Sequence, residues 1–206
     1  MGTGRMMYIV SGFMRSGTSM LMDALSAGGR EKGLKCEWSR ERDIQMNAAN
    51  ADEDFQPNSS YREIPLEEYG KMNFPLNYDE CLIKVMSWGL QQMRRTNGFR
   101  CVFMLRDPYE IAESHSRSFG KDLTVMEDGM KLPASESKSW GQQYEQQMKQ
   151  AIINAETRND CASLHVFNYS DVLKDPHTHF QLLSDCGWPI DHLVASSLVQ
   201  PNKKRV

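Results

Sequence analysis

A glycine-bearing loop near the N-terminus has the residue types and spacing of a phosphate site. Residues 8–21 read YIVSGFMRSGTSML, and four residues separate Gly12 from Gly17. When such a loop joins a strand to a helix, several backbone N–H groups point toward one place, and the helix N-terminus adds partial positive charge. The pattern predicts an anion site, with a glycine-rich turn that holds no ligand as the alternative.

The residue after Gly17 argues against a nucleoside triphosphate as the ligand. In the loop G-x-x-x-x-G-K-[ST], a lysine at that position reaches the β- and γ-phosphates. Here the position is Thr18, and the cation of the loop is Arg15, two residues before Gly17. A cation inside the loop would face whatever group is attached to the bound phosphate.

A second motif pairs an arginine with a serine further along the chain. Residues 102–119 read VFMLRDPYEIAESHSRSF, so Arg106 follows an apolar run and Ser114 lies eight residues later. If the run is a strand and the rest a helix, both side chains can reach one phosphate, the arginine as a fork and the serine as a hydroxyl donor. The alternative is an ion pair of Arg106 with Asp107 or Glu110.

In this order, SGFMRSGTSML and LRDPYEIAES resemble the sulfotransferase family, whose members use 3′-phosphoadenosine 5′-phosphosulfate (PAPS) as donor. The resemblance is greatest to small, soluble, bacterial-type members. Three further segments resemble that group, and together the five cover about half of the chain. These segments are ADEDFQPNSSYRE (51–63), FNYSDVLKDP (167–176) and LVQPNKKRV (198–206).

The resemblance implies a donor site built from both motifs. Arg15 would contact the transferring sulfonate and the bridging oxygen, and Arg106 and Ser114 would hold the 3′-phosphate. The 5′-phosphate would lie in a cradle of consecutive loop residues, Ser16, Gly17, Thr18 and Ser19.

The resemblance also places the adenosine. Tyr169 would approach the base, and the basic C-terminal residues would close over the nucleotide; they are Lys203, Lys204 and Arg205. The alternative for this basic end is a solvated tail.

The implied reaction is an in-line displacement at sulfur. Charge builds on the leaving phosphate and the sulfonate oxygens, so correctly placed cations and N–H groups stabilise the transition state without a metal ion. We expect Arg15 and Lys84 to supply this charge, because Lys84 lies in the apolar run 81–86 near the end of a predicted strand.

The general base departs from the family pattern. The family often has Lys-x-His on the strand that carries Lys84, but the third position here is Met86. Other members use a carboxylate from the segment after the first helix. Glu37 is our first candidate, with Glu53 and Asp54 next; a solvated surface carboxylate is the alternative for Glu37.

The elements that must position these residues alternate along the chain. Short apolar runs predict strands at 6–10, 81–86, 100–105 and 164–168. Helical spacing and capping residues predict helices at 18–27, ended by Gly28 and Gly29, and at 108–119, 135–157 and 175–186. Residues 120–134 are expected to form a loop, and residues 30–80 an irregular stretch with a helix near 40–50.

This alternation predicts a P-loop-type α/β fold: a three-layer sandwich with a mainly parallel central sheet. Ligands of such sheets bind beyond the carboxyl ends of the strands. We expect one domain over residues 1–206, with irregular insertions at about 30–80 and 119–140 on the acceptor side.

Composition limits the partners. With 24 Lys and Arg against 27 Asp and Glu, the net charge of -3 gives no global field for nucleic acid. No apolar run is long enough to span a membrane, and five scattered cysteines predict a reducing cytoplasm without disulfides or zinc.

The function predicted from sequence is sulfuryl transfer from PAPS to a hydroxyl or amine acceptor, without a metal ion. The acceptor itself is unassigned, and a homo-oligomer remains open. Two rivals also remain: a P-loop kinase of a small metabolite, and a nucleotide-binding protein without transferase activity.

Overall fold

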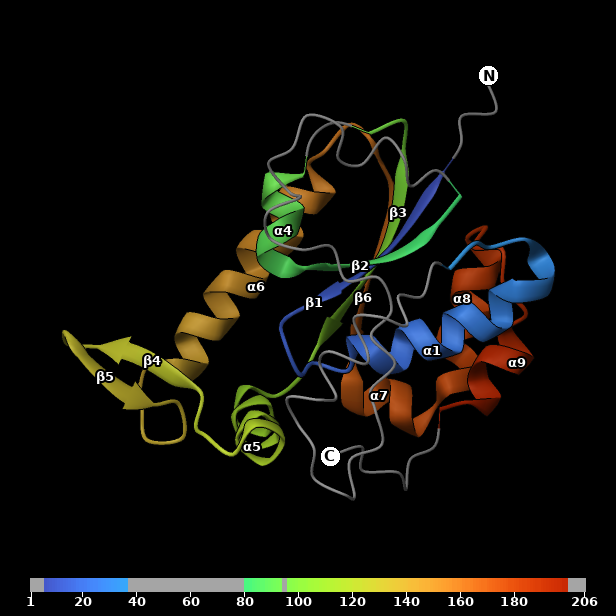
Figure 1. Ribbon diagram of the computed structural model, residues 1–206. Helices are drawn as coiled ribbons and strands as arrows, with labels where there is room; N and C mark the ends of the chain where they lie inside the picture. The colour runs from blue at the N-terminus through green and yellow to red at the C-terminus, as the bar shows by residue number, and fades with distance from the viewer. Residues whose placement is uncertain (1–5, 37–79, 94–95, 200–206) are drawn as a thin grey trace.

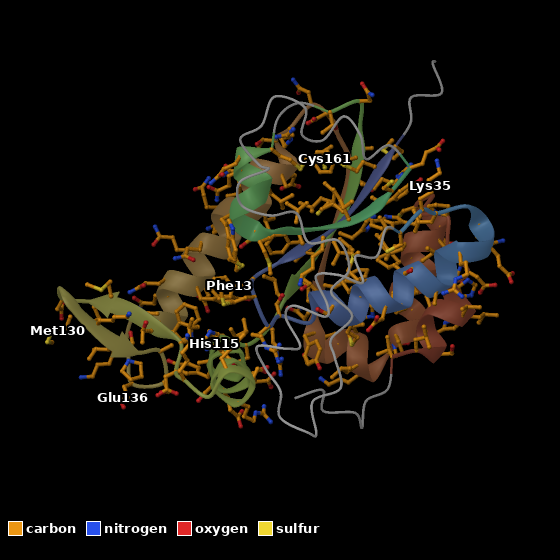
Figure 2. The ribbon with its side chains drawn as sticks, viewed as in Figure 1. Phe13, Lys35, His115, Met130, Glu136 and Cys161 are labelled. Atoms are coloured by element: carbon orange, nitrogen blue, oxygen red, sulfur yellow. The ribbon has the colours of Figure 1, made fainter. Side chains whose placement is uncertain are left out.

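A parallel sheet forms the centre of the protein (Figure 1). The computed structural model describes residues 6–36, 80–93 and 96–199. Within them, four strands pair in parallel in the order β2-β1-β3-β6. Their bounds are β1 Met7–Gly12, β2 Leu82–Met86, β3 Phe99–Leu105 and β6 Cys161–Asn168. The predicted mainly parallel sheet is confirmed.

The two central strands are apolar along their length because both of their faces are covered. Ile9 and Val10 of β1 and Val102 and Phe103 of β3 have no solvent-exposed surface. Neighbouring residues of each strand pack into different cores, one on each face of the sheet. A continuous apolar run therefore forms a strand buried on both sides.

Helices form the outer two layers, as predicted. The core on one face includes residues of α4 (Ser87–Gln92), α5 (Pro108–Phe119) and α6 (Trp140–Glu156). The core on the other face includes residues of α1 (Thr18–Gly29), α7 (Tyr169–Lys174), α8 (Pro176–Asp185) and α9 (His192–Ser197). Figure 1 shows α4 and α6 on one side of the sheet and α1, α8 and α9 on the other.

The predicted cap at Gly28 and Gly29 is wrong, because α1 continues through both residues and a short 3-10 helix, η1 (Arg30–Lys32), follows. At Gly28 an added Cβ would lie 2.7 Å from the Asp191 carbonyl oxygen, at the start of α9. The missing side chain therefore lets α1 and α9 pack closely.

The segment predicted as a loop at 120–134 contains an antiparallel hairpin of β4 (Thr124–Glu127) and β5 (Met130–Pro133). Its turn residues, Asp128 and Gly129, have φ angles of 49° and 79°. An Asp-Gly pair with positive φ at both residues suits a tight hairpin turn. The hairpin projects beside α5 and α6 (Figure 1).

Other boundaries follow the sequence to different degrees. Helix α5 spans the predicted residues, and its cap Asp107 accepts hydrogen bonds from the Tyr109 and Glu110 amides. Helix α6 begins at Trp140, later than predicted, and the six-residue helices α4, α7 and α9 were not predicted, because so few residues show no clear periodicity. The helix predicted near residues 40–50 lies outside the described residues.

Within the described residues, no helix combines the length and apolar character needed to cross a membrane.

Candidate anion-binding site

The loop between β1 and α1 curls tightly over the carboxyl end of the sheet. Gly12 and Gly17 have φ angles of 151° and 98°, and Arg15 between them has a φ of 64°. A Cβ added to Gly12 would lie 2.6 Å from the Met104 carbonyl oxygen of the neighbouring strand. Both glycines are therefore needed for the conformation of the loop.

The start of α1 can face an anion. Gly17 is its N-cap, and no side chain caps the first turn. The first N–H groups of a helix have no acceptor within the helix, so they are available to a negatively charged group. Thr18 is buried and Ser19 half-buried at this helix start.

Ser16 has another role in this structure. Its hydroxyl donates to the Phe13 carbonyl oxygen at 2.7 Å, and its backbone amide donates to the same oxygen at 3.2 Å. Ser16 has no solvent-exposed surface. These bonds close the loop on itself, so Ser16 shapes the loop and does not present its own amide or hydroxyl outward.

The Arg15 side chain extends from the loop to α5. Its Nε atom donates to Ser114 Oγ at 3.2 Å, and its Nη2 atom donates to Ser118 Oγ at 2.5 Å. Among the described residues, no carboxylate lies within ion-pair distance of this guanidinium. Burial lowers the pKa of Arg15, and the positive charges of Arg106 and Arg117 lower it further. The region therefore has a concentration of positive charge that an anion would stabilise.

Arg106 connects the second motif to the loop. Its Nη1 atom donates to the Arg15 carbonyl oxygen at 3.0 Å, while its Nε atom forms an ion pair with Glu110 Oε2 at 2.9 Å. The backbone amide of Arg106 donates to the Tyr144 hydroxyl at 3.3 Å. Of the two sequence interpretations of Arg106, the ion pair with Glu110 is present, and phosphate binding stays a prediction.

Tyr169 completes this arrangement from the far edge of the sheet. It is the first residue of α7, directly after β6. The Arg106 guanidinium lies over its ring, with Cζ 4.4 Å from the ring centroid. A Cβ added to Gly17 would lie 2.5 Å from Tyr169 Cδ2, so the ring also packs on the loop. Three segments far apart in sequence therefore meet at one place.

Of the remaining predicted residues, the structure describes Lys84 alone. Lys84 pairs with Val10 across the sheet, two residues before the end of β2, and is half-buried. Because side chains alternate along a strand, Lys84 shares a face with Leu82, toward α1. The remaining candidates lie outside the described residues: Glu37, Glu53, Asp54, Lys203, Lys204 and Arg205.

Sequence analysis missed Ser118 and Tyr144 as members of the site. Ser118 carries a weak signal, because it follows Ser114 by four residues and so lies on the same helix face. Tyr144 carries none, because α6 reaches Arg106 only through the tertiary fold.

Fold and site together define a parallel α/β protein with a glycine-loop site suited to anions. No family model matches the sequence, and no curated protein matches it. Retinol dehydratase in complex with androsterone and the inactive cofactor PAP aligns with a TM-score of 0.47, 15% identity and 93% coverage of this chain. Retinol dehydratase with retinol and PAP aligns with a TM-score of 0.43, 14% identity and 95% coverage. The chain spans 62% and 64% of those two chains.

Proposed function

We propose that the protein transfers a sulfuryl group from PAPS to a hydroxyl or amine acceptor. The observation that carries this proposal is the arginine inside the glycine loop. Arg15 is held against Ser114 of α5 and lies beside Arg106, while Thr18 takes the position of the kinase lysine. PAPS presents two phosphates and a sulfonate, and the site has donors for three anionic groups.

In this proposal each group of donors has a separate role. The N-terminus of α1, from Gly17 to Ser19, binds the 5′-phosphate, while Ser16 holds the loop in shape. Arg106 and Ser114 bind the 3′-phosphate, and Tyr169 lies toward the adenosine. Lys204 and Arg205 close over the nucleotide.

The chemistry requires positive charge where the sulfur–oxygen bond breaks. A hydroxyl oxygen attacks sulfur, the bridging oxygen leaves with its electron pair on the 5′-phosphate, and the hydroxyl proton passes to a base. Arg15 stabilises the charge that develops on the leaving and sulfonate oxygens, with Lys84 as the second cation. Glu37 is the proposed base, because Met86 cannot accept a proton, and Glu53 and Asp54 are the alternatives.

A nucleotide-binding protein without transferase activity is the second candidate function. The observation that favours it is Met86, which stands where a histidine base is often found and which pairs with Gly12 at the end of β2. A small-metabolite kinase is disfavoured, because Thr18 cannot supply the charge that the loop lysine gives to a triphosphate.

A binding comparison followed by a transfer assay tests the proposal. Adenosine 3′,5′-bisphosphate, titrated by calorimetry without magnesium, should bind at least about tenfold more tightly than ATP with magnesium, because one more charge-assisted contact is worth about 1.5–3 kcal/mol. Radiolabelled PAPS should then pass its sulfuryl group to a member of a panel of alcohols and amines. In the same assay, Glu37→Gln should lower turnover at unchanged donor affinity.

The outcomes separate the candidates. Tighter binding of ATP with magnesium would contradict the donor assignment. Tight binding of the bisphosphate without transfer to any acceptor would favour the binding protein.

A further inference from the structure

Two serine hydroxyls, one helical turn apart, hold the guanidinium of Arg15. Ser114 accepts from Nε at 3.2 Å and Ser118 accepts from Nη2 at 2.5 Å. Residues four apart lie on one helix face, so α5 presents both hydroxyls to the same side chain. Two contacts through different nitrogens fix both the position and the rotation of a planar guanidinium.

The partners of Arg15 leave its charge available. Serine hydroxyls are neutral, whereas a carboxylate at either position would form an ion pair and compete with an anionic ligand. Within the described residues, Nη1 has no hydrogen-bond partner, and the positive charges of Arg106 and Arg117 act on the same group. The serines therefore orient Arg15 without neutralising it.

The two serines differ in what else they are needed for. In the proposed function, Ser114 also donates to the 3′-phosphate, so its hydroxyl is shared between a ligand and Arg15. Within the described residues, Arg15 is the one side-chain hydrogen-bond partner of Ser118. Ser118 is half-buried on the last turn of α5.

We propose that Ser118 is a positioning residue for Arg15: its hydroxyl holds the Arg15 guanidinium in the orientation that meets the sulfonate during transfer. This inference rests on the proposed function. Arg15 touches the reacting group, and Ser118 acts only through Arg15. Loss of the hydroxyl should therefore affect the step in which charge develops more than donor binding.

Steady-state kinetics of matched serine variants test this role. Ser118→Ala should lower kcat about tenfold, since a hydrogen bond to a charged group is worth that much, and should change the donor KM by less than about threefold. Ser118→Thr, which keeps a hydroxyl, should recover most of the rate. Ser116→Ala on the same helix is the control, because the Ser116 side chain makes no hydrogen bond within the described residues. Equal rates for Ser118→Ala and Ser116→Ala would overturn the proposal.

A double-variant comparison shows whether Ser118 acts through Arg15. In an Arg15→Ala background, Ser118→Ala should cost less than about twofold further in kcat, because the partner is already gone. A full tenfold loss in that background would mean that Ser118 acts by another route, which also overturns the proposal.

A measurement without catalysis separates this inference from the proposed function. Phenylglyoxal modifies arginine, and mass spectrometry follows the modification of each residue separately. Ser118→Ala should speed modification of Arg15 about threefold or more, with Arg100, which donates to the Cys186 carbonyl oxygen elsewhere, as internal reference. Faster modification without transfer to any acceptor would refute the proposed function and still show that Ser118 orients Arg15. An unchanged modification rate would overturn the inference itself.

Discussion

At the residue scale, the Arg106 guanidinium makes three different contacts with described residues. It donates to the Arg15 carbonyl oxygen, pairs with Glu110, and lies over the ring of Tyr169. The planar fork of arginine permits this combination, and the compact ammonium of lysine would not. Arg106 thus connects the glycine loop, α5 and the start of α7.

Arg106→Ala should weaken adenosine 3′,5′-bisphosphate about tenfold or more, because a charge-assisted contact to the 3′-phosphate is lost. Adenosine 5′-phosphate lacks that phosphate, so its affinity should fall far less. Calorimetry with both ligands measures the difference. Glu110→Gln is the control, because it removes the ion pair and leaves the guanidinium, so bisphosphate affinity should be kept or rise. Equal losses for both nucleotides would contradict the 3′-phosphate assignment.

At the scale of elements, the glycine loop and α7 fit together at one backbone position. Gly17 has a φ of 98°, in the left-handed region, and the ring of Tyr169 occupies the space that a side chain would need. Gly33, after η1, has a similar φ of 82° but no atom within 4 Å of an added Cβ. Both glycines therefore need a positive φ, but a side chain at Gly17 would collide with Tyr169 and one at Gly33 would meet open space.

Gly17→Ala should therefore destabilise the protein more than Gly33→Ala. Both substitutions cost about 1–2 kcal/mol for a left-handed alanine. Gly17→Ala should cost roughly 1–3 kcal/mol more, because Tyr169 must shift. Urea unfolding measures both free energies. Gly17→Ala should also weaken adenosine 3′,5′-bisphosphate while Gly33→Ala does not. Equal destabilisation would show that the ring adapts at no cost.

At the scale of the whole molecule, the candidate site lies at the carboxyl ends of the parallel strands, and an ion-pair cluster lies at their amino ends. Just before the amino end of β6, Asp160 accepts two hydrogen bonds from Arg158 at 2.9 and 2.8 Å and one from the Thr96 amide at 2.6 Å. Arg158 also donates to the Met93 carbonyl oxygen, so the cluster joins two connecting segments, the one between α4 and β3 and the one between α6 and β6. Burial acts to raise the pKa of Asp160, but the bonds from Arg158 and Thr96 outweigh it and lower that pKa.

Asp160→Asn should lower the free energy of unfolding at neutral pH by about 1–3 kcal/mol, the worth of hydrogen bonds to a charged group. Because the pKa of Asp160 is lower in the folded state, its contribution is complete above about pH 4 and is lost as the pH falls below that. Urea unfolding from pH 7 to pH 3 should show the two proteins converging at low pH. Nucleotide affinity should not change, because the cluster is remote from the glycine loop. A constant difference across this range would contradict the ionic role.

Local sequence was sufficient for the elements whose signals lie within a few residues. Gly12, Gly17 and the apolar run before them predicted strand, loop and helix, because positive φ and burial are requirements of individual positions. Asp107 and Pro108 predicted the start of α5, because an N-cap side chain and a proline in the first turn also act within a few residues. The alternation of apolar runs with helices predicted the parallel sheet. A helix between two strands is long enough to bring the chain back to the starting end of the sheet, as a parallel pair of strands requires.

Tertiary structure decided which of these residues meet. Arg15 and Ser118 are 103 positions apart, and no local pattern requires their contact. Tyr169 reaches Gly17 only because β6 lies beside β3 and runs parallel to β1, so both strands end on the same side of the sheet. Gly28 looked like a helix end, but it lies within α1, at a position where the close approach of α9 leaves no room for a side chain. Sequence patterns record the conformation that each residue requires, whereas contacts between distant segments depend on the order and register of the strands.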